Sequence, residues 1–365
     1  MPLTANVVGV CRRVDKGTQM EMPWRFDGGD KELTVKGLVD KWVVHAATYY
    51  KDCLGRPTSE VAGVEIAMRL LRQMYGERRV WDLRHRDIVA WRGAMEHSGI
   101  CRYTVNKRLN IFRRMMRWAL DEDLVSALSV AELTQIQPLK RNRSAAPERK
   151  PIMPVDDATV AKTLPELPPS TADMVIVHRR TGMRPGEICA LKWADIDRSA
   201  TPWVYRPEHH KNEWRGHPRV VCIGPIARTV LERHADVAPD VPIFSPIVAE
   251  GERFAAMRAA ARSPSRYDRR NPDPAKRRKL NNKWTPCEYT RSIRKACKRA
   301  GVATWGSNRL RHAFATEVRR AFGLAACRAV LGHSDGESSV TDRYSFEAIE
   351  DETIAAARTA VEALG

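Results

Sequence analysis

Four short segments from residue 181 onward bring together side chains that suit chemistry on a phosphate ester. They are TGMRPGE (181–187) with Arg184 and Glu187, HHKNEWRGHPRVV (209–221) with Lys211 and Arg215, SNRLRHAFATEV (307–318) with Asn308 and Arg311, and LGHSDGESSVTDRYSF (331–346) with His333 and Tyr344. Guanidinium forks can hold phosphate oxygens, and a tyrosine hydroxyl is a nucleophile once it loses its proton.

Taken singly, each segment has an ordinary structural interpretation. Arg184 and Glu187 stand three residues apart, as a surface ion pair on a helix does. The Lys211 segment reads as a polar turn, Arg311 as a partly exposed helical residue, and Tyr344 as a packing residue near the C-terminus. Only their combination in one order indicates a site.

The charge of the chain indicates a polyanionic partner. The formal net charge is +18 over 365 residues, and nucleic acid is the commonest polyanion in a cytosol. A basic protein with a solvated surface is the alternative. The eight cysteines are scattered without a CxxC pair, which favours reduced thiols in the cytoplasm over zinc or disulfide frameworks.

Several function classes receive no support from the sequence. It contains no P-loop motif, no evident carboxylate cluster for Mg²⁺, no apolar run long enough to cross a membrane and no secretory signal. We therefore expect no metal, no cofactor and no membrane partner.

The first part of the chain predicts an arm and a helical domain. Residues 1–32 are polar and aperiodic, and we expect a short, flexible arm. Apolar spacing then predicts four helices over 33–125, with Thr34 capping the first and Thr104 the fourth. Four cations of the fourth helix lie mostly off its apolar stripe, and we expect them to contact DNA backbone, with a solvated helix face as the alternative: Lys107, Arg108, Arg113 and Arg114. We also expect Arg215, in the segment 209–221, to contact DNA.

The second part predicts a linker, a mixed domain and a tail. Residues 126–153 end in a Pro-rich basic run and read as a basic linker, either crossing DNA or a disordered tether. Over 154–346 we expect helices and a hairpin formed by 203–208 and 218–224, with a basic loop insertion at 247–284. Residues 347–365 predict a helical tail, packed either on its own domain or on a neighbouring subunit.

Together the four segments resemble the tyrosine recombinases, the family of the phage integrases. The resemblance is close over about 154–346 and looser over 33–125, where it implies a core-binding domain. Residue by residue it implies that Arg184 and Arg311 bind the phosphate, that Glu187 supports Arg184, and that Lys211 is the general acid. His333 matches the residue that hydrogen-bonds the phosphate, and Tyr344 the nucleophile.

Two departures from the family pattern stand out. Asn308 occupies the place of a usual histidine, and asparagine can donate a hydrogen bond but cannot carry a proton at neutral pH. The spacing from His333 to Tyr344 is about two residues longer than usual. Alternatively, Asn308 caps the helix that bears Arg311.

The resemblance implies a mainly α fold with a small β component, in which a helical core-binding domain and an α+β catalytic domain form a C-shaped clamp on DNA. It implies site-specific strand exchange through a 3′-phosphotyrosine, by a homotetramer on double-stranded DNA, with DNA-bending accessory factors as possible partners. Integration or excision of a mobile element is the expected task. A DNA-binding protein weakened in catalysis and a type IB topoisomerase are the alternatives.

Overall fold

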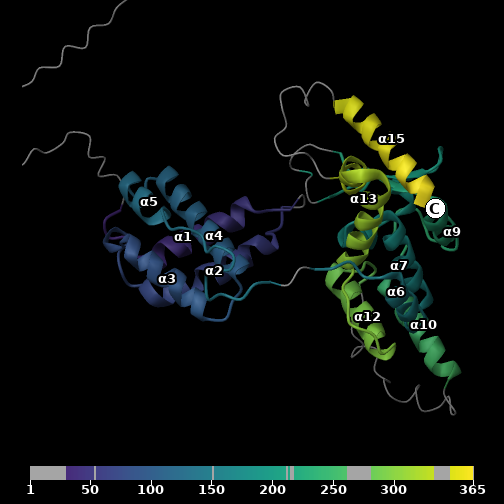
Figure 1. Cartoon of the computed structure of the whole chain (residues 1–365), viewed down its shortest axis with the longest axis horizontal. Helices are drawn as coiled ribbons and strands as arrows, with labels where there is room; N and C mark the ends of the chain where they lie inside the picture. Colours follow the sequence, from purple (N-terminus) through teal and green to yellow (C-terminus); the bar gives the residue numbers. More distant parts are fainter. Residues whose placement is uncertain are drawn as a thin grey trace, which may run out of the picture. The chain divides into compact units, whose positions relative to one another are not determined.

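The computed structural model describes residues 30–52, 55–149, 152–210, 213, 218–260, 281–332 and 346–364, with only the backbone at 324 and 346–353 (Figure 1). The chain divides into two compact units, residues 1–150 and 151–365, and each is described by itself. Within the described ranges, no helix is long and apolar enough to span a membrane.

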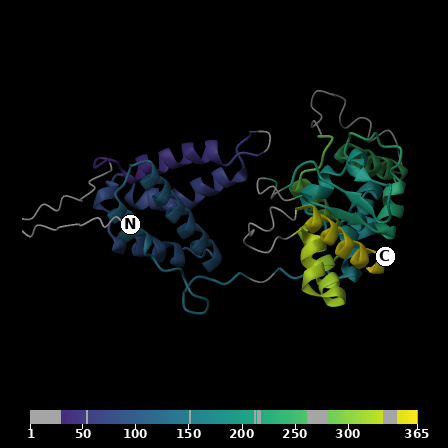
Figure 2. The ribbon, with the colours of Figure 1, turned by 90° about the horizontal axis from the view of Figure 1, so that it is seen from above.

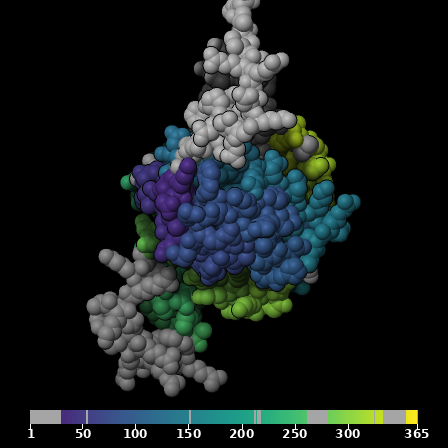
Figure 3. All heavy atoms as spheres, turned by 90° about the vertical axis from the view of Figure 1, so that its left-hand side faces the viewer, coloured from purple at the N-terminus to yellow at the C-terminus, as the bar shows by residue number. Residues whose placement is uncertain are grey.

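In its described residues, unit 1 consists of helices joined by turns and loops, without a β-strand. Its helices are α1 (Val35–Tyr49), α2 (Ser59–Tyr75), η1 (Val80–Asp82), α3 (His85–His97), α4 (Arg102–Asp121) and α5 (Ala127–Thr134). Thr34 caps α1 as predicted, since its side-chain oxygen accepts from the N–H of Gly37 at 3.1 Å. The apolar stripe of α4 is buried at all of its predicted positions: Val105, Leu109, Phe112, Met116 and Ala119. The side chains of α2 and α3 form much of the face seen in Figure 3.

Two sequence predictions for unit 1 are wrong. The cap of α4 is Cys101, three residues before the predicted Thr104, because the helix begins at Arg102. Residues 126–149 are not a free linker. α5 follows its own cap, Ser126, and the segment buries Leu133, Ile136 and other apolar side chains in the core of unit 1.

Unit 2 combines helices with a small antiparallel sheet. Its helices are α6 (Asp157–Thr163), η2 (Leu164–Glu166), α7 (Pro169–Thr181), α8 (Pro185–Ala190), η3 (Trp193–Asp195), α9 (Pro225–Glu232), α10 (Pro246–Ala259), α12 (Pro286–Arg299), α13 (Asn308–Leu331) and α15 (Phe346–Leu364). β2 (Trp203–Tyr205) pairs with β3 (Val221–Ile223) as the predicted hairpin, and β1 (Ile196–Asp197) adds a third strand that was not predicted.

The predicted loop insertion at 247–284 is wrong in its first part. Residues 246–259 form α10, which begins after the cap residue Ser245, whose hydroxyl accepts from the N–H of Ile247 at 3.2 Å. The helix packs against α7. Residues 261–280 of the predicted insertion lie outside the described residues.

The last two helices lie side by side in unit 2 (Figures 1 and 2). α13 contains a kink at Gly323, whose backbone is non-helical. α15 contacts α13 and β3, and buries Ala360 and Val361 against them. The tail therefore packs on its own unit, one of the two arrangements considered from the sequence.

Candidate active site

The turn between α7 and α8 carries the first arginine. Gly182 follows α7 with a left-handed φ of 61°, and its N–H donates to the carbonyl of His178 at 3.1 Å. Only glycine fits, since a Cβ at 182 would lie 2.3 Å from Cδ1 of Phe314 and side chains rarely adopt this φ. Pro185 then opens α8, so that Arg184 takes the cap position.

The carboxylate of Glu187 is the centre of a buried ionic cluster. It accepts from the backbone N–H and from Nη1 of Arg184, both at 2.7 Å. Arg219 donates through Nε and Nη2 to its two oxygens at 3.2 and 3.3 Å. Burial alone would raise the pKa of Glu187, but the charge of Arg219 and these hydrogen bonds outweigh it and lower the pKa to about 2. Glu187 is therefore ionised at neutral pH.

The second arginine, Arg311, joins two parts of the cluster. Its Nη1 donates to the carbonyl of Gly182 and its Nη2 to that of Leu331, both at 2.7 Å. Burial, followed by the positive charges of Arg219 and Arg184, lowers the pKa of Arg311 to about 9. A bound anion would stabilise a cation in such surroundings.

Both predicted arginines reach the same end of α13. Arg311 bonds to Leu331, and Nη2 of Arg184 lies 3.5 Å from the carbonyl of Gly332. The structure thus brings together Arg184, Glu187 and Arg311. His333 follows Gly332 directly, but His333 and Tyr344 lie outside the described residues.

A buried, neutral histidine stabilises the turn between α7 and α8. His178 is fully buried, and burial lowers its pKa to about 4. Its Nε2 lies 2.9 Å from the carbonyl of Met183, which can only accept, so this nitrogen carries the proton. Nδ1 is then free to accept from the hydroxyl of Tyr289 at 3.4 Å. His178 therefore fixes the backbone directly before Arg184.

Asn308 does not cap α13. The cap residue is Ser307, and the amide nitrogen of Asn308 instead lies 3.2 Å from Nε2 of His312, one turn along the helix. Both side chains are exposed. The capping alternative is therefore wrong, while a role beside the phosphate stays a prediction.

The hairpin between β2 and β3 approaches the cluster through His210. Burial lowers the pKa of His210, and the charges of Glu187, Arg184 and Arg219 act on it as well. The next residue is Lys211, the predicted general acid. Lys211 and Arg215 both lie outside the described residues.

The four predicted DNA contacts on α4 have different surroundings. Arg113 donates to the carbonyls of Thr134 and Ile136, and Arg114 binds Glu60 at 2.9 Å, so both stabilise unit 1 itself. Lys107 is exposed. Burial, with the nearby charge of Arg69, lowers the pKa of Arg108. Among the four, exposure favours Lys107 alone as a contact to phosphate, and this contact stays a prediction.

Sequence reasoning missed Arg219, and one signal could have found it. Arg219 is the only charged residue in the extended run PRVVCIG (218–224). A lone cation in a run that forms a buried strand needs an ionised partner. The partner, Glu187, lies 32 residues earlier in the chain and gives no local sign of the pairing.

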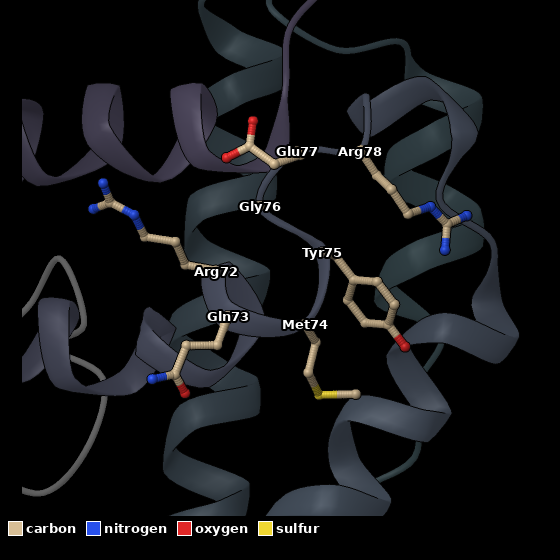
Figure 4. Close-up of a pocket in the computed structure, with 7 residues that line it drawn as sticks. All are labelled: Arg72, Gln73, Met74, Tyr75, Gly76, Glu77 and Arg78. Carbon is tan, nitrogen blue, oxygen red and sulfur yellow. The ribbon is translucent and has the colours of Figure 1, made fainter.

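The hollow shown in Figure 4 is not part of this cluster. It measures about 240 Å³ and lies in unit 1, at the end of α2, where residues 72–78 line it. Its cations already have partners: Arg72 binds Asp40 at 2.8 Å and Arg78 binds Asp87 at 3.1 Å. Among the described residues, no group of three His, Cys, Asp or Glu side chains could hold a metal ion.

Comparison with solved structures identifies the fold. The Tn1549 transposon integrase in complex with circular intermediate DNA matches with a TM-score of 0.56 at 17% identity, covering 86% of this chain and 98% of that one. A lambda integrase dimer bound to a COC′ core site matches with a TM-score of 0.57 at 14% identity, covering 86% and 77%. A lambda integrase tetramer bound to a Holliday junction gives 0.57 at 14%, covering 87% and 78%.

These neighbours are tyrosine recombinases, so the chain has the tyrosine recombinase fold, as the sequence predicted. No protein-family model and no curated protein sequence matches the chain. At these low identities the likeness concerns the fold.

Proposed function

We propose that this chain is a site-specific DNA recombinase that cleaves and rejoins DNA strands through a 3′-phosphotyrosine intermediate. One observation carries the proposal: Arg184 and Arg311 converge on the end of α13, in a cluster where Arg219 is a third cation and Glu187 the carboxylate between them. A buried excess of positive charge favours an anion such as a phosphodiester.

In this proposal the two arginines hold the non-bridging oxygens of the scissile phosphate. In-line attack builds negative charge on these oxygens, and two guanidinium forks can neutralise it while fixing the phosphate. Glu187 keeps Arg184 in place through its backbone and side-chain hydrogen bonds. His333, directly after Gly332, would add a further hydrogen bond to the phosphate.

The covalent step would use Tyr344 and Lys211. The phenol oxygen of Tyr344 attacks the phosphorus as its proton passes to solvent, and the bond to the 5′ oxygen breaks. The leaving oxygen takes the electron pair and accepts a proton from Lys211. The phosphotyrosine stores the bond energy, so the reverse reaction rejoins the strand without ATP.

At the level of the assembly, the core-binding domain (33–125) and the catalytic domain (154–346) would close around duplex DNA as a clamp. Strand exchange would take place in a homotetramer on two synapsed sites, in the cytoplasm, during integration or excision of a mobile element. The solved structures that support this assembly include one integrase with circular intermediate DNA and another as a tetramer on a Holliday junction.

Asn308 supports a second candidate function, that of a DNA-binding protein without cleavage. Its amide cannot carry a proton, and it already contacts His312. The presence of Tyr344 and both arginines favours catalysis instead.

Covalent trapping on nicked duplexes tests the proposal. The duplexes should be tiled across the DNA that flanks the gene, because the target lies there if the gene travels with its own element. A recombinase leaves a covalent protein–DNA band once the nicked fragment diffuses away, whereas a non-cleaving DNA-binding protein gives a mobility shift alone. A two-site assay then separates recombination from the relaxation of supercoils by a topoisomerase.

A further inference from the structure

We propose that Arg219 is a positioning residue of the catalytic site, which shares the Glu187 carboxylate with Arg184 and ties β3 to the end of α13. This inference rests on the proposed function. It assigns a role to a residue that contacts neither the phosphate nor the nucleophile in that mechanism.

The guanidinium of Arg219 joins three elements. Nε and Nη2 donate to the two oxygens of Glu187 on α8, at 3.2 and 3.3 Å. Nη1 donates to the carbonyl of Val330 in the last turn of α13 at 2.9 Å, and to that of Val220 at 3.1 Å. The residue itself directly precedes Val220 and β3. One side chain thus connects the hairpin strand, the helix that follows Arg184, and the helix that ends before His333.

Glu187 receives a matched pair of contacts from each arginine. Each of its oxygens accepts one hydrogen bond from Arg184 and one from Arg219. Because the carboxylate is held from both sides, its orientation is fixed, and with it the orientation of the Arg184 guanidinium. A fork is needed for this arrangement, since a lysine ammonium cannot reproduce two parallel bonds.

Gly332 packs directly on the same guanidinium. A Cβ at 332 would lie 2.7 Å from Nη1 of Arg219, and the φ of 59° also favours glycine. The carbonyl of Gly332 lies 3.5 Å from Nη2 of Arg184. The last described residue before His333 is therefore held between Arg184 and Arg219.

The positive charge of Arg219 also lowers the pKa of Glu187. Arg219 is 4% exposed, and burial lowers its pKa while Glu187 opposes that shift. Removing one member of a buried ion pair leaves the other charge uncompensated. Without Arg219, the pKa of Glu187 would rise from this low value, because burial disfavours the ionised carboxylate and Arg184 would be the only hydrogen-bonded cation left to oppose it. A protonated Glu187 is a weaker acceptor for Arg184.

Other groups also act on Glu187 and stay in place when Arg219 is changed. Glu187 interacts electrostatically with charged or titratable groups on α7, α8, β2, the hairpin and α13: His178, Arg184, Tyr205, His210 and Arg311. His178 and Tyr205 are buried and neutral, and Arg184 and Arg311 are cations in both variants described below. A change in the pKa of Glu187 in these variants therefore results from the change at Arg219.

The first test uses the protein without DNA and does not depend on the proposed function. Thermal unfolding is followed from pH 4 to 7 for the wild type, Arg219→Gln and Arg219→Lys. In the wild type the depressed pKa of Glu187 contributes stability that is full above 4.5 and is lost as the pH falls toward 2. In Arg219→Gln the pKa of Glu187 is higher, so this stability is smaller and is lost at a higher pH. The difference in Tm from the wild type should widen with pH for Gln and stay nearly constant for Lys.

The second test uses single-turnover cleavage of the nicked duplex from pH 5 to 8. We expect no acid limb for the wild type, and for Arg219→Gln a loss of about tenfold per pH unit below the new pKa. Arg219→Lys should be slower at every pH without an acid limb, because it keeps the charge and loses the fork. DNA affinity should stay within about twofold for both, since Arg219 is buried away from the phosphates. In Arg219→Gln/Glu187→Gln the acid limb should disappear.

These outcomes separate positioning from simple support of the fold. A loss of rate that is equal at all pH values in Arg219→Gln would overturn the proposal. If Arg219→Gln fails to fold, Arg219→Lys decides alone: cleavage at the wild-type rate from pH 5 to 8 would show that the fork is not needed. If the wild type cleaves no DNA, the proposed function fails, while the stability measurement still decides the interaction of Arg219 with Glu187.

Discussion

Arg311 gives the proposed phosphate site its clearest test among single residues. Its guanidinium is buried, bonded to two carbonyls and close to two other arginines. Arg311→Ala should slow cleavage by about 10²–10³-fold, by analogy with the loss of one donor to a developing oxyanion. Arg320→Ala, an exposed arginine on the same helix, is the matched control and should change the rate less than about twofold. A rate for Arg311→Ala close to that of this control would contradict the assignment.

Asn308 tests whether the departure from the family pattern is functional. Because Ser307 and not Asn308 holds the N-cap position of α13, an acidic residue at 308 stands in the first turn and faces the positive end of the helix. Asn308→Asp should therefore keep or raise the Tm by a small amount, while it slows cleavage by repelling the phosphate. Asn308→His should remain active, and faster cleavage would show that a proton carrier was missing. A fully active Asn308→Asp enzyme would remove this residue from the catalytic set.

Sequence reasoning found the residues whose motifs are local, and missed those whose roles depend on long-range contacts. Arg184 and Glu187 are three residues apart, and their hydrogen bonds follow from the turn of one helix. Arg219 is one of 62 Lys and Arg residues, and its partners Glu187 and Val330 lie far away in the chain. His178 was missed for the same reason, because its role depends on burial beneath the turn before Arg184.

Among the elements, the turn between α7 and α8 should respond most sharply to one added methyl group. Gly182→Ala combines a left-handed φ with a Cβ that would lie 2.3 Å from Phe314 in the core. We expect a loss of about 1–2 kcal/mol for the backbone and of about 1–3 kcal/mol for overpacking. The control is Gly301→Ala, which has a similar φ of 66° and no atom within 4 Å, and should lose only the backbone part. Equal denaturant midpoints for the two variants would show that the Phe314 ring moves aside at little cost in stability.

The elements were predictable where an apolar stripe spans several turns. The helices α1 to α4 follow from such stripes, and the hairpin of unit 2 follows from two short extended runs. α5 was missed because it has only eight residues and is held by tertiary contacts, such as those of Arg113 with the carbonyls that follow it. β1 has two residues, and its pairing with Val204 and Tyr205 has no sequence signature.

For the whole molecule, the net charge of +18 predicts a strong dependence of DNA binding on salt. Each contacted phosphate releases counterions, and roughly 6–10 contacts would lower the affinity about 10³–10⁵-fold between 50 and 200 mM salt. Fluorescence anisotropy with a labelled duplex gives the slope. A flat dependence would contradict a clamp that encloses the DNA backbone. Lys107→Ala should reduce the salt slope by about the value of one phosphate contact. Arg113→Ala should instead lower mainly the folding stability of unit 1.

Identification of the covalent bond tests the central claim most directly. The wild-type adduct with a nicked duplex is digested, and the modified peptide is mapped by mass spectrometry. We expect the 3′ phosphate of the cleaved strand on Tyr344, and in Tyr344→Phe no adduct at nearly unchanged DNA affinity, because the phenol oxygen contributes little to binding. A covalent band that persists in Tyr344→Phe, or an adduct through the 5′ end, would contradict the account. Tyr267 would then be tested next, ahead of Tyr205 and Tyr289, which are fully buried.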